Sequence, residues 1–223
     1  MRGALMAEFA GTALLLAIVV GSGIMAENLA AGNNAIALLA NSLATGAGLY
    51  VLISVFAPIS GAHFNPVVSM AEFGMGEMPA NRLVSYVTVQ VFGGIIGVWI
   101  AHAMFAMPLL QASLKIHTGP AQWFSEIVAT AVLLGTIRLG IKFANDRIAL
   151  LVALIVTAGY WFTASTFFGN PAVTIARSMT NTFAGIRLAD TAGFVMAQLM
   201  AVILVVGMER YLACKYCVGR NEN

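Results

Sequence analysis

A short motif occurs twice in this chain, and each copy opens an apolar stretch. The copies are Asn65-Pro66-Val67 and Asn170-Pro171-Ala172, 105 residues apart. Asn is a favoured helix N-cap, and Pro suits the first helical position because its fixed φ matches the helix and no N–H is needed there. Each copy therefore predicts a helix start. A helix that begins inside an apolar region points its free N–H groups and positive dipole end into that region.

The composition places this apolar region in a membrane. Of the 223 residues, 60% are hydrophobic and 9% are charged, and the mean hydropathy is +0.90. Too few polar residues remain to cover a water-soluble surface. A spanning helix needs about 20 mostly apolar residues. Six stretches qualify as expected spans, namely 4–25, 35–57, 82–107, 121–142, 147–168 and 188–212.

The distribution of Lys and Arg predicts the orientation. With both termini in the cytoplasm, eight of these eleven residues lie on the cytoplasmic side and three on the other, Lys115, Arg177 and Arg187. We therefore expect a multi-pass protein of the inner (plasma) membrane, surrounded by the lipid bilayer, with 214–223 as a short cytoplasmic tail. We expect the first stretch to be a retained helix rather than a signal peptide. The net charge of +2 gives no reason to expect a nucleic-acid partner.

Other residues recur in the same order and reveal a repeat. Glu8 has a counterpart in Glu126, and Gln90 has one in Gln198. The repeats cover about 1–107 and about 120–213 of a single transmembrane domain, and each contains three spans. An odd number of spans makes the second repeat enter the membrane from the opposite face, so the repeat is inverted.

The segments that follow the two Asn residues, 65–75 and 170–180, are too short to cross a membrane. We expect re-entrant half-helices that meet near the midplane of an all-α membrane protein. Such segments are tolerated where they line a watery cavity, and paired positive helix ends repel cations and protons. The residues favour a passive channel for uncharged solutes. A coupled secondary transporter shares the repeat and the broken helices, but the expected pore lacks ion ligands and a titratable relay.

These motifs resemble those of the aquaporin and aquaglyceroporin (major intrinsic protein) family. The resemblance rests on Ser60-Gly61-Ala62-His63-Phe64-Asn65-Pro66-Val67, on Gly169-Asn170-Pro171-Ala172-Val173 and on the repeated Glu and Gln. It implies six helices in a right-handed bundle, two half-helices, one pore per subunit and a homotetramer. The small residues of Gly93-Gly94-Ile95-Ile96-Gly97 permit close helix packing, within a subunit or between subunits.

The resemblance also implies a selectivity filter, and this chain departs from the common one. Most relatives carry Arg three positions after the second Asn, where this chain has Val173. The other filter positions fall at Thr45, at Ala158 (or Gly159 if the register slips by one) and at Phe167. Thr, Ala and Val in place of an aromatic, a His and an Arg predict a wider, more apolar constriction.

We therefore expect solutes larger than water, such as glycerol, urea-like molecules and neutral arsenic or antimony hydroxides, and organic arsenicals as a further class. Water is expected as a lesser or additional permeant. The alternative is a water-selective channel. Val at the Arg position is similar to a bacterial branch of the family associated with metalloids.

Three residues beside the motifs allow two interpretations each. Val67, where Ala is usual, adds bulk beside the pore or contributes to selectivity. His63 is expected to bond loop backbone rather than to carry protons. Arg177, one turn beyond Val173, is either a cation of the outer vestibule or a helix-end residue that binds carbonyls or lipid headgroups.

The remaining polar residues predict no chemistry. Glu8 and Glu126 are expected to accept backbone N–H groups of the re-entrant loops, in a scaffold rather than a proton relay. Cys214 and Cys217 are expected to be reduced thiols, although such a pair can bind soft metals. We find no catalytic cluster and no motif for a metal or cofactor, so we expect a protein that is not an enzyme.

Overall fold

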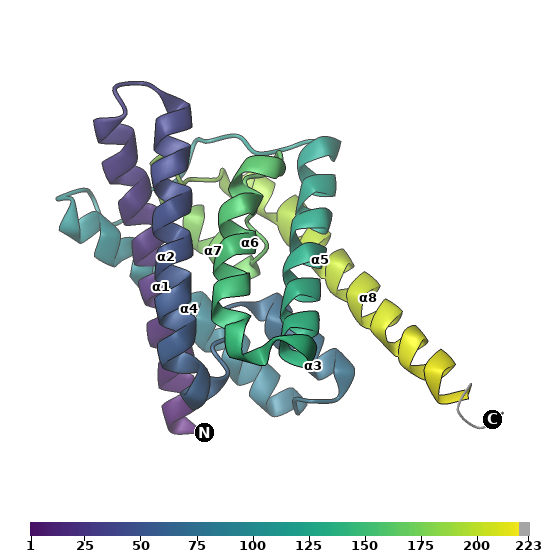
Figure 1. The fold of residues 1–223 in the computed structure, drawn as a ribbon. Coiled ribbons are helices and arrows are strands. Elements are labelled where there is room, and N and C mark those ends of the chain that lie inside the picture. The colour runs from purple at the N-terminus through teal and green to yellow at the C-terminus, as the bar shows by residue number, and fades with distance from the viewer. Residues whose placement is uncertain (219–223) are drawn as a thin grey trace.

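The structure is a computed structural model that describes residues 1–218, with side chains described as far as Cys214. Within these residues it is all-helical (Figure 1). Six helices are long and apolar enough to cross a membrane. They are α1 (Arg2–Leu29), α2 (Asn34–Ser60), α4 (Ala80–Met104), α5 (Pro120–Phe143), α6 (Ile148–Phe162, preceded by the 3-10 turn η1, Asn145–Arg147) and α8 (Leu188–Val218).

Two short helices, α3 (Pro66–Met75) and α7 (Pro171–Arg177), follow the two motifs. Asn65 and Asn170 are their N-caps, with extended backbones and side-chain oxygens that accept N–H bonds from the first turn. The helix starts predicted at the two motifs are therefore confirmed. The second half-helix is shorter than the expected 170–180 because the chain turns at Ser178.

One predicted span is wrong at its end. The stretch 147–168 was expected to be helical throughout, but α6 ends at Phe162. The chain from Thr163 to Asn170 runs without regular structure to the middle of the molecule, where α7 begins. An apolar segment does not distinguish a helix from a buried extended loop, so hydropathy alone placed this boundary six residues too late.

The repeat is visible in the arrangement of the helices. In the first half α1 packs against α2 and α4, and in the second half α5 packs against α6 and α8. Helix α1 begins and α8 ends on the same side of the bundle, and α3 lies in that half of the molecule (Figure 1). We call this side the near end and the opposite side the far end.

The small residues of α4 serve packing inside the chain. A Cβ added to Gly93 would lie 2.5 Å from the carbonyl oxygen of Phe9, and one added to Gly97 would lie 2.1 Å from that of Ala13. Both distances are too short for any residue but glycine. The pattern therefore brings α4 against α1, as the interpretation within a single subunit expects.

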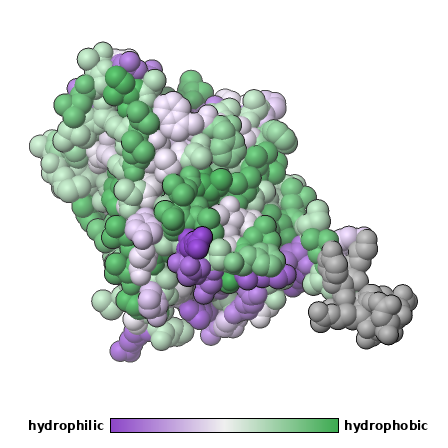
Figure 2. Space-filling model, viewed as in Figure 1, coloured by the Kyte–Doolittle hydropathy of each residue, from purple (hydrophilic) through white to green (hydrophobic). Residues whose placement is uncertain are grey.

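The surface fits a lipid environment. In the face shown in Figure 2, hydrophobic residues fill the middle, and hydrophilic residues gather along the near end with a smaller group at the far end. Many large apolar side chains are exposed on the long helices. Soluble monomers rarely expose contiguous apolar patches larger than a few hundred square ångströms, so a surface of this kind is expected to be covered by lipid.

Candidate functional site

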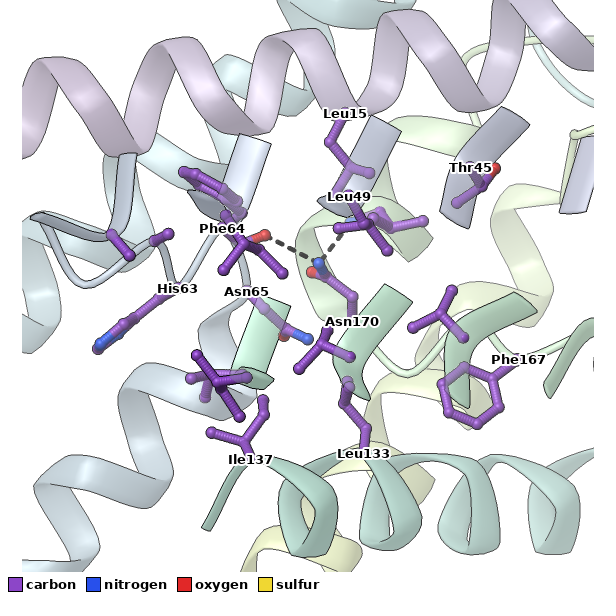
Figure 3. Close-up of a pocket in the computed structure, with 18 of the residues that line it drawn as sticks. Leu15, Thr45, Leu49, His63, Phe64, Asn65, Leu133, Ile137, Phe167 and Asn170 are labelled. Atoms are coloured by element: carbon purple, nitrogen blue, oxygen red, sulfur yellow. Dashed lines mark hydrogen bonds between the residues drawn. The ribbon is translucent and has the colours of Figure 1, made fainter. Parts of the chain in front are cut away.

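A cavity of about 320 Å³ runs between the two half-helices. Its walls come from α1, α2, α3, α5, α6, α7 and the loops that precede the motifs. Asn65 and Asn170 meet at its middle, Leu15 and Leu49 lie on one side, and Leu133 lies on the other (Figure 3). The wall is thus mostly apolar, with its polar groups placed at the centre and at the two ends.

Each of the two asparagines donates a hydrogen bond to the re-entrant loop that precedes the other one. The Nδ2 of Asn65 donates to the carbonyl of Gly169 at 2.8 Å. The Nδ2 of Asn170 donates to the carbonyl of Phe64 at 2.9 Å (Figure 3). Each Oδ1 meanwhile caps its own half-helix. An amide nitrogen carries two hydrogens, so each Asn keeps one N–H that the opposite loop does not use. Two amide donors are therefore present where the two loops meet.

Both loops approach the centre with the same unusual backbone. The residues one and three positions before each Asn have positive φ, namely Ala62 (52°), Phe64 (48°), Phe167 (57°) and Gly169 (54°). Left-handed backbone is unfavourable for residues other than glycine and persists where the surroundings enforce it. Here it turns the carbonyls of Phe64 and Gly169 toward the asparagine of the opposite loop.

Glu8 is the anchor of the first loop. It is fully buried, and its carboxylate accepts the N–H of His63 at 3.0 Å and that of Phe64 at 2.7 Å. It also accepts hydrogen bonds from the Ser60 hydroxyl and the Gln90 amide. Four donors on one carboxylate satisfy its charge inside the protein, as a scaffold requires.

Glu126 anchors the second loop in the same way. It is fully buried and accepts the N–H groups of Phe168 and Gly169, both at 2.9 Å, and the amide of Gln198 at 2.7 Å. Gln198 also donates to Thr174, as Gln90 does to Ser69 in the first repeat. The structure thus places both glutamates where the sequence expected them, against the backbone of the re-entrant loops.

At the near end the cavity is lined by His63 and Glu72. The Nε2 of His63 lies 3.1 Å from a carboxylate oxygen of Glu72, and its Nδ1 lies 2.9 Å from the Ser69 hydroxyl. The expectation that His63 bonds loop backbone is therefore wrong, because both ring nitrogens face side chains of α3. Glu72 was missed from the sequence. Its position seven residues after Asn65, on the helix face of Val68, could have identified it.

The far end is lined by Thr45, Tyr160, Phe167 and Val173. The hydroxyls of Thr45 and Tyr160 lie 3.2 Å apart and join α2 to α6. Val173 is buried on α7, where its apolar side chain faces the cavity. Tyr160 was missed because counting back from Asn170 through an irregular segment could not fix which face of α6 meets the cavity.

Ala158 is not part of this ring. It is exposed on the outside of α6, whereas Gly159 is buried, and neither residue lines the cavity itself. A Cβ on Gly159 would lie 2.1 Å from the ring of Phe167. The one-residue slip in register that the sequence left open is therefore the better match, with Gly159 making room for Phe167.

Arg177 is buried in the wall of the far end rather than exposed on the outer surface. It is 4% exposed and lines the far end of the cavity. Its Nε donates to the carbonyl of Ala184, and its guanidinium lies 3.5 Å from the centre of the Phe168 ring. The carbonyl contact agrees with one of the two interpretations. The aromatic contact with Phe168 could not be read from the sequence, because their side chains meet only in the folded loop.

His117, in the loop between α4 and α5, supports this aromatic contact from outside. Its ring packs edge-on against Phe168 and Phe194, with ring centres 5.7 and 6.1 Å apart. Burial and the nearby positive charge of Arg177 lower the pKa of His117 to about 4. The imidazole is therefore neutral at ordinary pH and acts as a packing residue, a role that carried no signal in the sequence.

Two further residues singled out in the sequence lie away from the cavity. Val67 is fully buried with Val68, Ala71 and Leu134, and it does not line the cavity. Cys214 is an exposed free thiol, while the side chain of Cys217 lies outside the described part of the chain. Through Cys214, no group of three or more His, Cys, Asp or Glu side chains could hold a metal ion.

The cavity, its paired asparagines and the inverted repeat are matched by a known family. Residues 1–161 match the family described as Major intrinsic protein. This chain belongs to that family. Its members are membrane channels rather than enzymes, which agrees with a cavity whose walls carry amides and apolar groups.

Individual relatives extend this result over most of the chain. An aquaglyceroporin named AqpS, from Rhizobium meliloti, is 52% identical over 206 residues, which cover 92% of this chain and 88% of the relative. A probable glycerol uptake facilitator protein of Thermotoga maritima is 32% identical over 170 residues, covering 68% of this chain and 70% of the relative. The crystal structure of the aquaglyceroporin from Plasmodium falciparum has the same fold, with a TM-score of 0.72 over 96% of this chain and 98% of that one at 16% identity.

Proposed function

We propose that this channel conducts small uncharged solutes larger than water. The class comprises glycerol, urea-like molecules and neutral hydroxides of arsenic and antimony, with organic arsenicals as a further group and water as a lesser permeant. The observation that carries the proposal is Val173, an apolar residue on the cavity wall three positions after Asn170. The names of two relatives, aquaglyceroporin and probable glycerol uptake facilitator protein, support the polyol part.

In this proposal each part of the cavity has its own task. Asn65 and Asn170, each followed by Pro at the first helical position, present amide donors at the narrow middle. Thr45, Phe167 and Val173 line the selectivity filter, and Gly159 leaves the space that Phe167 occupies. A solute that loses water on entry recovers hydrogen bonds from the amides, while the aliphatic wall accommodates its carbon skeleton. The two half-helix N-termini oppose the entry of cations.

The assembly and orientation belong to the same proposal. We infer a homotetramer in the inner membrane, with the near end and both termini in the cytoplasm and the far end outside. The excess of Lys and Arg toward the near end supports this orientation. Protease accessibility of an epitope at the C-terminus in intact and inverted vesicles tests the orientation, and chemical crosslinking in membranes tests the assembly.

Solute flux into proteoliposomes tests the channel itself. Water, glycerol, urea and trivalent arsenic are compared for the wild type, for Val173→Arg and for Val173→Leu, which adds volume without donors. We expect Val173→Arg to lower glycerol and urea permeability by at least about tenfold while water flux changes less, because a guanidinium at this position narrows the pore. An unchanged solute range would place the filter elsewhere, and no arsenic uptake above empty vesicles would remove the metalloid part.

A coupled transporter is the competing function. Coupling requires an ion site or a titratable relay at the centre of the membrane, and the centre of this cavity presents two amides among aliphatic side chains. Glycerol flux that is independent of proton and sodium gradients supports the channel. Flux that collapses when either gradient is abolished would favour the transporter.

A further inference from the structure

Arg177 places a cation beside the solute path, one helical turn beyond the position that most relatives give to Arg. It follows Val173 by four residues, so both lie on the same face of α7, roughly 6 Å apart along its axis. Both residues line the cavity. The chain thus lacks an arginine at the common filter position but has one on the same wall, slightly farther out.

The surroundings fix the position of this side chain. The Arg177 Nε donates to the carbonyl of Ala184, and the Phe168 ring lies under the guanidinium at 3.5 Å. Phe168 is itself held edge-on by Phe194, with ring centres 5.0 Å apart. An arginine that stacks on an aromatic ring and bonds a carbonyl keeps its charge and loses most of its freedom to move. Arg177 is therefore a built part of the wall rather than a mobile surface residue.

No carboxylate neutralises this charge in the part of the chain that the structure describes. The Arg177 guanidinium forms no ion pair there, and its only hydrogen bond in those residues is the one from Nε. Asp190 is bound to Arg187 at 2.8 Å and to the N–H of His117. Glu126 is occupied by the second loop. The terminal amino groups of Arg177 therefore remain available to the cavity that it lines.

We propose that Arg177 is the cation-excluding residue of the filter in this chain and takes over that task from the position of Val173. The charge acts on ions at the far end, where the hydroxyls of Thr45 and Tyr160 lie on other walls of the cavity. Because the side chain lies one turn farther out and is held over the Phe168 ring, it leaves the space at Val173 open. The pore can then admit solutes larger than water and still exclude protons and metal cations.

Electrostatics makes one charge sufficient for a large effect. In a low-dielectric wall a unit charge repels a cation much more strongly than it would in bulk water, and a difference of about 1.4 kcal/mol already changes passage tenfold. The inference rests on the proposed function, since it concerns the same pore. It nevertheless predicts a different quantity. The proposed function predicts the flux of neutral solutes, whereas the role of Arg177 predicts the flux of ions.

The test measures glycerol flux and proton flux in the same proteoliposomes, the second with a pH-sensitive dye under a potassium–valinomycin clamp. Four variants are compared with the wild type: Arg177→Gln, Arg177→Lys, the double variant Val173→Arg with Arg177→Gln, and the control Lys115→Gln. Lys115 is a far-end cation that pairs with Glu27 and does not line the cavity. Glycerol flux of the wild type separately tests the proposed function.

We expect Arg177→Gln to conduct glycerol and to raise proton flux at least about tenfold. Arg177→Lys and Lys115→Gln should remain proton-tight, and the double variant should regain tightness while losing glycerol flux. A proton-tight Arg177→Gln that conducts glycerol would overturn the inference and leave the proposed function intact. Failure of both single Arg177 variants to assemble would make the residue structural and would overturn it as well.

Discussion

The two re-entrant loops share one scaffold and differ in what they present to the cavity. Behind the loops, Glu8 and Glu126 accept the same two backbone N–H groups, those of the residues one and two positions before the asparagine. In front of them, the first repeat places His63 and Glu72 at the near end, whereas the second places Val173 and Arg177 at the far end.

This difference separates the cause of the fold from the cause of selectivity. A buried carboxylate that binds backbone N–H groups fixes the path of a loop whatever its side chains are. The side chains on the cavity side of the half-helices are then free to differ between repeats. The near end contains an acid and an imidazole in hydrogen-bond contact. The far end contains the guanidinium of Arg177, which has no carboxylate partner among the described residues.

The largest expected effect tests the shared scaffold. In Glu8→Gln or Glu126→Gln, an amide NH₂ faces donors that a carboxylate oxygen had accepted, which costs about 3 kcal/mol per site. We expect both variants to lose stability by similar amounts in thermal unfolding in detergent. Glu27→Gln is the control, since Glu27 is about half exposed and its pair with Lys115 lies at the surface. A loss confined to one of the two variants would show that the loops are not held equivalently.

The second prediction concerns pH and the far end alone. The pKa of His117 is about 4 in the fold, below its ordinary value of 6.5. Between these values the unfolded chain binds a proton that the native state does not, so stability rises with pH across this range and falls as pH drops from about 6.5 to about 4.

His117→Phe should remove this dependence, because Phe keeps the aromatic packing and cannot titrate. Thermal unfolding between pH 4 and pH 7 makes the comparison, with His63→Phe at the near end as the matched variant. An identical loss of stability at acid pH in the wild type and in His117→Phe would assign the effect to another titrating group.

The third prediction addresses Tyr160, the far-end polar group that the sequence missed. Tyr160→Phe removes one side of the hydroxyl pair with Thr45, worth about 1 kcal/mol, and should lower glycerol permeability about fivefold. Tyr50→Phe, on the exposed face of α2, is the control and should change nothing. Equal fluxes in all three proteins would mean that the far-end hydroxyls do not bind the solute.

The smallest effect is expected at Val67, which departs from the usual residue of the motif. Val67→Ala removes buried volume from the contact with Leu134 and should cost about 1 to 2 kcal/mol of stability. Because Val67 does not line the cavity, the ratios of water, glycerol and urea flux should stay as in wild type. A changed ratio would show that Val67 contributes to selectivity.

Much of this site could be predicted from the sequence because it depends on local rules. The helix starts at the two Asn-Pro motifs follow from helix capping, and the six spans follow from hydropathy. The equivalence of Glu8 and Glu126 follows from the repeat. The filter position in α6 did not follow, because Ala158 and Gly159 differ by about 100° around a helix. Counting back from Asn170 cannot fix that angle when an irregular segment of unknown path lies between them.

The sequence by itself determined that this chain crosses a membrane six times and brings two capped half-helices to its centre, because hydrophobic length and helix capping act through neighbouring residues. Only the tertiary structure decided which side chains face the solute. Arg177 reaches the cavity wall because Phe168 and the Ala184 carbonyl, brought to it by the folding of two loops, hold it there. Such contacts join elements whose relative position is set by packing, so rules based on neighbouring residues cannot predict them.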